Sequence, residues 1–221
     1  GIYYGSKAKE AVKAWTHLEN GYRDYPVNIM FSYYGPMHDG VVWDLALLPK
    51  DTSLPRTWQL VDKPDGDRIG ECLQRGHTMT EAVLLTENMR NEWLEGMKYL
   101  PVNGQEEQRS VAAALQVLLA SGNNILKFYE LRSLLGKKIG DAEEILQEME
   151  AIVNEEICNS TKMIALCEVD SRLGYHSEAE GYKFFPEKLR DRIEKLELLK
   201  NLEFVQVRQN ISEGKAPLAW Y

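Results

Sequence analysis

Hydrophobic residues recur at three- and four-residue intervals over most of the chain, and this spacing places them along one face of an α-helix. The first such pattern follows Ser6, a residue type that can cap a helix, and it ends near Gly21, shortly before Pro26. The stripe comprises Ala8, Ala11, Val12, Trp15, Leu18, Glu19 and Tyr22. The chain is therefore predicted to open with an amphipathic helix.

Two further helical patterns precede residue 137. The first begins at Arg68 or Thr78 and ends at Tyr99. Its stripe comprises Ala82, Leu85, Met89, Trp93 and Met97. The second runs from Val111 towards Gly136, and its central sequence Gly122-Asn123-Asn124 is expected to favour a kink.

The remaining two patterns have clear N-terminal signals. One starts at Asp141, which has Glu144 at the spacing of a capping box. The other starts at Pro186, because proline suits a first helical turn, and it is expected to continue through Val205. Isolated helices of this length are marginal in water, so their apolar faces must be buried against each other. The predicted fold class is all-α, an up-and-down bundle of about five helices.

Residues 26–66 interrupt this regularity. The segment holds five of the eight prolines, and proline disrupts helices because it lacks an amide donor and clashes with the preceding turn. We expect a helix in residues 1–25, an irregular aromatic- and proline-rich segment packed on the bundle in 26–66, the helical bundle in 67–213 and a tail in 214–221. All four belong to one structural domain. Alternation typical of a strand is confined to a few residues around Val41 to Leu48.

Composition and charge exclude several classes of function. The 221 residues carry a net charge of −8, which disfavours a nucleic-acid partner because a polyanion needs a basic surface. No uninterrupted apolar run approaches the roughly 20 residues that span a bilayer, so no membrane association is expected. Cys72, Cys158 and Cys167 are too few and irregular for a disulfide scaffold, and the last two fall on opposite helix faces. The four histidines form no pair at metal-ligand spacing, so no metal or cofactor is predicted.

Two stretches are richer in chemistry than connections require. Residues 28–43 mix aromatic and turn-forming residues, among them Tyr33, Tyr34 and Trp43. Their flat faces and polar edges suit sugar rings, whose C–H faces stack on aromatic groups while the hydroxyls form hydrogen bonds. The alternative is that these aromatic side chains plug one end of the bundle, since large aromatic residues are highly buried on average.

Residues 167–184 form the second stretch, which is longer than a plain interhelical turn. In one interpretation Asp170 and Arg172 pair and fix the turn. In the other, Arg172, His176 and Glu178 direct hydrogen-bonding groups into a cleft.

Evidence for catalysis by this chain is weak. Cleavage of a glycosidic bond commonly needs two carboxylates at defined separation, and Glu71, Glu178 and Glu180 are only candidates to lie near a substrate. No nucleophile elbow, phosphate loop or zinc signature is present. This chain is not expected to be catalytic on its own.

The same two stretches resemble a known group of proteins. They are similar to the helical C-terminal region of large bacterial glycoside hydrolase-like proteins. The similar residues are the run from Ala14-Trp15 to Tyr25-Pro26, the sequence Tyr33-Tyr34-Gly35-Pro36 and the later run from Glu168 to Tyr175. In that group a sugar-cleaving barrel precedes a helical region with a W…YP…YYGP-type segment and a D-[SP]-R-L-G-[WYF] turn. The similarity covers most of the chain in order, through short motifs.

The resemblance implies a carbohydrate-active parent protein that is exported to the periplasm or beyond the cell. This chain would pack against the catalytic domain of the same parent chain, and Tyr34, Arg172 and Tyr175 are the matched positions expected to reach the sugar cleft. No barrel-like alternation of strands and helices occurs here, so the catalytic carboxylates of such a parent would lie elsewhere.

Two other functions are compatible with the sequence. A helical protein-protein interaction module without catalytic activity would use an exposed apolar stripe to bind a partner. A complete enzyme would instead depend on Glu71 or Glu178 for turnover.

Overall fold

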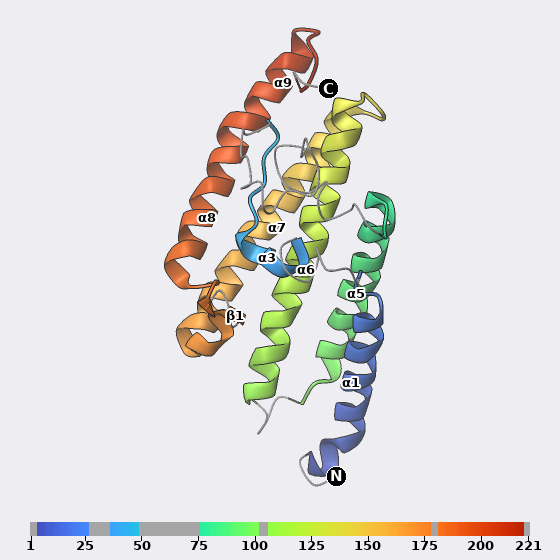
Figure 1. The fold of residues 1–221 in the computed structure, drawn as a ribbon, viewed down its shortest axis with the longest axis vertical. Helices are drawn as coiled ribbons and strands as arrows, with labels where there is room; N and C mark the ends of the chain where they lie inside the picture. The colour runs from blue at the N-terminus through green and yellow to red at the C-terminus, as the bar shows by residue number, and fades with distance from the viewer. Residues whose placement is uncertain (1–3, 27–35, 49–75, 102–105, 178–180, 219–221) are drawn as a thin grey trace.

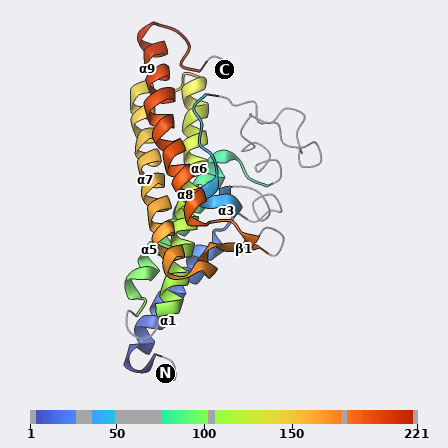
Figure 2. The ribbon, with the colours of Figure 1, turned by 90° about the vertical axis from the view of Figure 1, so that its left-hand side faces the viewer.

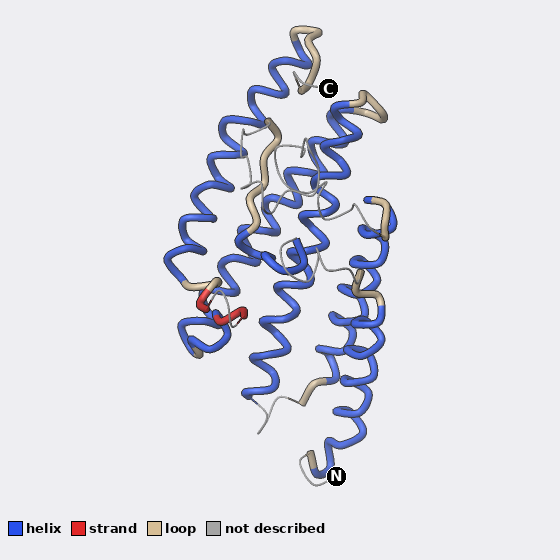
Figure 3. Tube along the Cα trace, in the orientation of Figure 1, coloured by secondary structure: helices blue, strands red, loops and turns tan. Residues whose placement is uncertain are grey.

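The computed structural model describes residues 4–26, 36–48, 76–101, 106–177 and 181–218, and this part of the chain confirms the all-α class. Five long helical elements dominate it (Figure 3). The α-helices are α1 (Ala8–Arg23), α3 (Pro36–Asp39), α5 (Met79–Tyr99), α6 (Glu106–Gly136), α7 (Ala142–Val169), α8 (Pro186–Leu198) and α9 (Val205–Ser212). The 3-10 helices η1 (Gly5–Lys7), η2 (Gly40–Val42) and η4 (Ser171–Gly174), the π-helix η5 (Leu199–Phe204), and the antiparallel strands β1 (Tyr175–Ser177) and β2 (Gly181–Tyr182) complete the described elements.

The long helices lie side by side in an elongated array. Helix α1 packs on α5, α5 on α6, α6 on α7 and α7 on α8, so α6 lies between α5 and α7 (Figure 1). A tight turn after Gly136 joins α6 to α7, and these two helices run in opposite directions. Figure 2 shows α3 and β1 on the same side of this array. The short elements are thus gathered on one face.

Local sequence signals explain where the helices begin. Thr78 caps α5 in a complete capping box with Glu81, and the Asp141 carboxylate accepts hydrogen bonds from the first free amides of α7. Pro186 occupies the first turn of α8, as predicted. The expected cap at Ser6 was wrong, because this residue lies inside η1 and Lys7 takes the cap position without a side-chain bond.

The predicted buried face of α1 was also wrong in phase. The helix buries Ala11, Ala14, Leu18 and Gly21, whereas Val12, Trp15 and Tyr22 are 66%, 45% and 59% exposed. Close packing against α5 is the reason. A β-carbon on Gly21 would lie 2.9 Å from the carbonyl oxygen of Met89, so only small side chains allow this approach. The larger apolar residues are left on the outer surface.

Helix α6 forms the centre of the array. Its sequence Gly122-Asn123-Asn124 is buried within one continuous helix, despite the expectation of a kink. By length and mean hydropathy α6 qualifies as a candidate membrane span, but 67% of its most apolar window is buried inside the structure. These properties are also those of the core helix of a bundle.

Residues 43–48 form an extended segment that we call the strap. Its backbone is held by side chains rather than by a neighbouring strand: Tyr129 donates to the carbonyl of Asp44 and Arg132 to that of Ala46, at 2.9 and 2.8 Å. Glu203, in the π-helix η5, accepts hydrogen bonds from the amides of residues 47 and 48. The strand-like alternation predicted between Val41 and Leu48 therefore forms no paired strand: Val41 and Val42 belong to η2, and residues 43–48 form the strap without strand pairing among the described residues.

The tail after α9 also contacts the bundle. The side chain of Leu218 is fully buried in the main hydrophobic core. Asn210 donates a hydrogen bond to the carbonyl of Pro217 at 3.3 Å. The C-terminal residues up to 218 are thus part of the packed structure.

Candidate functional site

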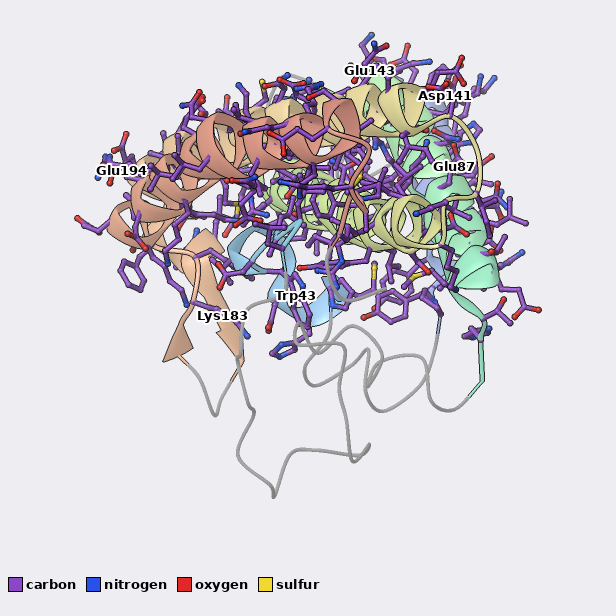
Figure 4. The ribbon with its side chains drawn as sticks, turned by 90° about the horizontal axis from the view of Figure 1, so that it is seen from above. Trp43, Glu87, Asp141, Glu143, Lys183 and Glu194 are labelled. Atoms are coloured by element: carbon purple, nitrogen blue, oxygen red, sulfur yellow. The ribbon has the colours of Figure 1, made fainter. Side chains whose placement is uncertain are left out.

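The two chemistry-rich stretches meet at one place, which we call the junction. Lys183, just after β2, places its ammonium group 2.5 Å from Asp39 Oδ1 and 3.1 Å from His38 Nδ1, both at the end of α3. The side chains of Lys183 and Asp39 are 11% and 12% exposed. Figure 4 shows Trp43 and Lys183 on the same side of the helices. Segments about 145 positions apart in sequence are therefore joined by a partly buried ion pair.

The junction has two hydrogen-bonding arrangements. His38 Nδ1 lies 2.8 Å from the Asp39 carboxylate as well as near the Lys183 ammonium. A proton on Nδ1 allows the imidazole to donate to Asp39, whereas a bare Nδ1 accepts from Lys183. The donor and acceptor roles at His38 Nδ1 therefore depend on the tautomer of the ring.

A small hydrophobic cluster contains residues that follow the junction residues directly in sequence. Val41 of η2 packs in it with Val117 of α6, Cys167 of α7 and Phe184 before α8. The carbonyl of Gly174 accepts hydrogen bonds from the amides of Lys183 and Phe184 at 2.9 and 3.0 Å. A side chain at Gly174 would have its β-carbon 2.9 Å from the Phe184 carbonyl oxygen, so glycine is required for this close return of the chain.

Arg172 lies on the outer surface of η4. It binds the carboxylate of Asp170 with Nε and Nη2, at 2.9 and 2.7 Å, and its Nη2 is 3.0 Å from Glu107 Oε1 of α6. This pairing lowers the pKa of Asp170 and raises that of Arg172. The predicted pairing of Asp170 with Arg172 is confirmed. Because the arginine side chain is 70% exposed, this pair adds little stability, and its guanidinium remains accessible.

Arg172 also borders a surface trough over the first half of α6. Two adjoining hollows of about 300 and 280 Å³ share Glu107, Val111 and Leu115 as lining residues. Arg172 lines the first hollow and Trp15 the second. We call this feature the α6 trough. It presents an exposed indole at one end and a charged hydrogen-bonding group at the other.

Trp43 occupies a different position from the one expected of a sugar platform. Its side chain is 2% exposed and packs in the main core, so its ring faces are covered by protein. Its burial fits the alternative in which the aromatic side chains are covered by protein, but not their place at one end of the bundle, because Arg192, which binds its carbonyl, pairs with Glu156 in the middle of α7. Its carbonyl accepts hydrogen bonds from Arg192, which anchors the start of the strap.

The other predicted site residues are only partly accounted for by the structure. Tyr33, Tyr34 and Glu178 lie outside the described residues, as do Glu71 and Glu180. Tyr175 and His176 form part of β1, whose backbone alone is described. Their roles stay predictions.

Sequence reasoning missed a buried polar network in the centre of the bundle. Glu156 is fully buried and pairs with Arg192 at 2.8 Å, with side-chain exposures of 0% and 4%. The same carboxylate accepts hydrogen bonds from Ser121, Asn124 and Asn159. The sequence signal was a glutamate aligned with the apolar stripe of α7, where a solvent-facing residue is not expected. A buried charge of this kind needs its partners, so the network fixes the packing of α6, α7 and α8.

The two cysteines that the structure describes are free thiols. Cys158 is exposed and Cys167 is buried, which confirms that they occupy different faces of α7. Burial raises the pKa of Cys167 to about 11, with a further contribution from the charge of Asp170. Among the described residues no group of three His, Cys, Asp or Glu side chains is arranged to hold a metal ion.

Comparison with known proteins adds no assignment. No family model, curated protein or solved structure matches this chain.

Proposed function

We propose that this chain is an accessory helical domain of an exported, bacterial, glycoside hydrolase-like protein. In this proposal an up-and-down bundle packs on the catalytic barrel of the same parent chain and contributes side chains to the sugar cleft. One observation carries the proposal: the aromatic-rich stretch and the stretch around Arg172 converge on one face, through the contact of Lys183 with Asp39 and His38. Convergence is what a shared binding surface requires of segments so distant in sequence.

The α6 trough supplies suitable chemistry for a saccharide. Trp15, which is 45% exposed, offers an apolar ring on which the C–H face of a sugar can stack. Arg172 offers N–H donors, and Glu107 and Asp170 offer carboxylate acceptors, for the hydroxyl groups at the ring edge. The charged groups already orient one another, so little side-chain entropy is lost when a ligand binds.

Glycan-array screening followed by calorimetric titration tests this proposal, with the domain and its full-length parent measured in parallel. We expect Arg172→Ala and Trp15→Ala each to weaken oligosaccharide binding by at least about tenfold, because each removes a direct contact. Arg190→Ala is the matched control. Arg190 is also an exposed arginine paired with a carboxylate, that of Glu168, but it lines neither hollow.

Two results would contradict the proposal. One is the absence of any bound glycan for both the domain and the full-length protein. The other is a bound glycan whose affinity is the same in Arg172→Ala, Trp15→Ala and Arg190→Ala.

A second function, a protein-protein interaction module without catalytic activity, is favoured by the outer face of α1. Val12, Trp15 and Tyr22 are exposed along one side of this helix. Such a stripe can dock on another protein surface. Light scattering distinguishes this function: a stable dimer that is lost in Val12→Glu and shows no response to sugars would favour it over the accessory domain.

A further inference from the structure

A separate groove on the bundle has the features of a small-molecule site. It has a volume of about 480 Å³ and runs between α5 and α7 with α6 as its floor. This size lies within the range of about 300 to 1,000 Å³ that is usual for ligand pockets. Its position is distinct from the junction and from both hollows of the α6 trough, although Val117 of its floor also packs beneath the junction.

The groove has a polar end and an apolar end. Because α6 and α7 are antiparallel, Ala120 lies near Glu155 and Asn159, and Arg90 of α5 reaches the same end, where it binds Glu155. Apart from Gln116 of α6, the opposite end is formed by apolar side chains. They are Leu94, Ala113, Val117, Ala165 and Leu166. A ligand in this groove should therefore be amphiphilic.

Asn159 provides a specific acceptor at the polar end. Its side chain is 2% exposed, and its Nδ2 donates to Glu156 Oε1 at 2.9 Å. Its Oδ1 accepts no hydrogen bond from the residues that the structure describes, although the residue lines the groove. An amide oxygen with a free lone pair at the wall of a groove can accept a hydrogen bond from an N–H or O–H group of a ligand.

The charges at the groove favour a negative ligand. Arg90 and Lys162 contribute two positive charges against one negative charge from Glu155. Arg90 is paired with Glu155, whereas Lys162 is exposed and forms no ion pair with any described residue. The Lys162 ammonium is therefore available for a carboxylate.

We propose that this groove binds an aliphatic carboxylate that carries one N–H or O–H donor next to its head group, such as an N-acyl amino acid. The donor would satisfy Asn159 Oδ1, the carboxylate would pair with Lys162, and the acyl chain would follow the apolar end. Residues 155 to 166 of α7 line the groove and span about 16 Å, which accommodates the head group together with an acyl chain of about eight carbons. This inference does not rest on the proposed role in sugar binding.

Titration calorimetry with N-octanoylglycine tests the ligand chemistry on the whole chain. N-octanoylsarcosine has the same chain and charge without the N–H donor, and we expect it to bind about three- to tenfold more weakly. Octylamine has the opposite charge and is expected not to bind. Equal affinity for all three compounds, or no binding of N-octanoylglycine, would overturn the assignment.

Variants locate the ligand. Lys162→Glu is expected to weaken N-octanoylglycine binding by about fivefold or more, whereas Lys188→Glu makes the same charge change on an exposed face of α8 and should leave binding unchanged. Ala113→Leu narrows the apolar end, and circular dichroism verifies that the variant is folded. A folded Ala113→Leu protein with undiminished affinity, or equal effects of the two lysine variants, would refute this location.

Discussion

Replacing Arg192 with methionine probes the link between the buried network and the strap. Methionine keeps much of the aliphatic bulk but removes every donor. Arg192 donates to Glu156 at 2.8 Å, to Ser160 at 3.0 Å and to the carbonyl of Trp43 at 3.2 Å. The substitution leaves the fully buried carboxylate of Glu156 without its counterion.

The magnitude follows from the cost of an uncompensated buried charge. Breaking one partner of a buried ion pair lowers the free energy of unfolding by about 3 to 5 kcal/mol. For a chain of this size, that loss corresponds to a fall in Tm of about 6 to 20 °C. Ser121, Asn124 and Asn159 still donate hydrogen bonds to the Glu156 carboxylate in the variant. We therefore expect a loss of unfolding free energy near the lower end of this range.

Urea unfolding followed by circular dichroism measures the global effect, and amide hydrogen exchange at Leu47 and Leu48 measures the strap. Both readouts should change in Arg192→Met. Arg190→Met on the same helix removes only an exposed pair with Glu168 and should change stability by no more than about 0.5 kcal/mol. A loss below about 1 kcal/mol in Arg192→Met, or an equal loss in the control, would refute the reasoning.

Three further outcomes are expected. Gly21→Ala should destabilise the fold by about 1 to 2 kcal/mol in chemical denaturation, because the new β-carbon contacts the backbone of α5. Asn20→Ala, on the exposed side of α1, should not destabilise it. A stabilised Gly21→Ala protein would show that α1 and α5 are further apart than the structure places them. Thr78→Ala should cost about 0.5 to 2 kcal/mol through loss of the α5 cap, and an unchanged urea midpoint would contradict that role. In a Cys72→Ser background at pH 8, iodoacetamide should modify Cys158 readily and Cys167 only on unfolding, because burial and a pKa of about 11 keep the Cys167 thiol protonated until well above this pH. Mass spectrometry of peptides measures both modification rates, and comparable rates would contradict the burial of Cys167.

The helix starts at Asp141 and Pro186 could be predicted from the sequence because their signals are local, whereas the start at Arg68 or Thr78 stayed open and the expected cap at Ser6 was wrong. Thr78, Asp141 and Pro186 each act within one turn of the residue itself. The buried face of α1 could not be predicted in the same way. A pattern of large apolar residues assigns Trp15 to the core, but the close approach of α5 at Gly21 selects the small residues and turns Trp15 outward.

The candidate site was predictable only in part. The pairing of Asp170 with Arg172 follows from two residues in one turn, and the sequence suggested it. The buried positions of Trp43 and Glu156 depend on Arg192, which is distant in sequence and reaches both through tertiary packing. Hydrophobic periodicity treats a glutamate as solvent-facing, so it cannot indicate a buried carboxylate whose partners lie on other helices.

The central claim is that the aromatic-rich stretch and the stretch around Arg172 share one surface. A double-mutant cycle with Asp39→Asn and Lys183→Met tests it most directly, with unfolding free energies as the readout. The contact at 2.5 Å predicts a coupling energy of about 0.5 to 3 kcal/mol between the two substitutions. Additive effects within about 0.3 kcal/mol would mean that the two stretches do not meet, and the proposed sugar-binding face would lose its basis.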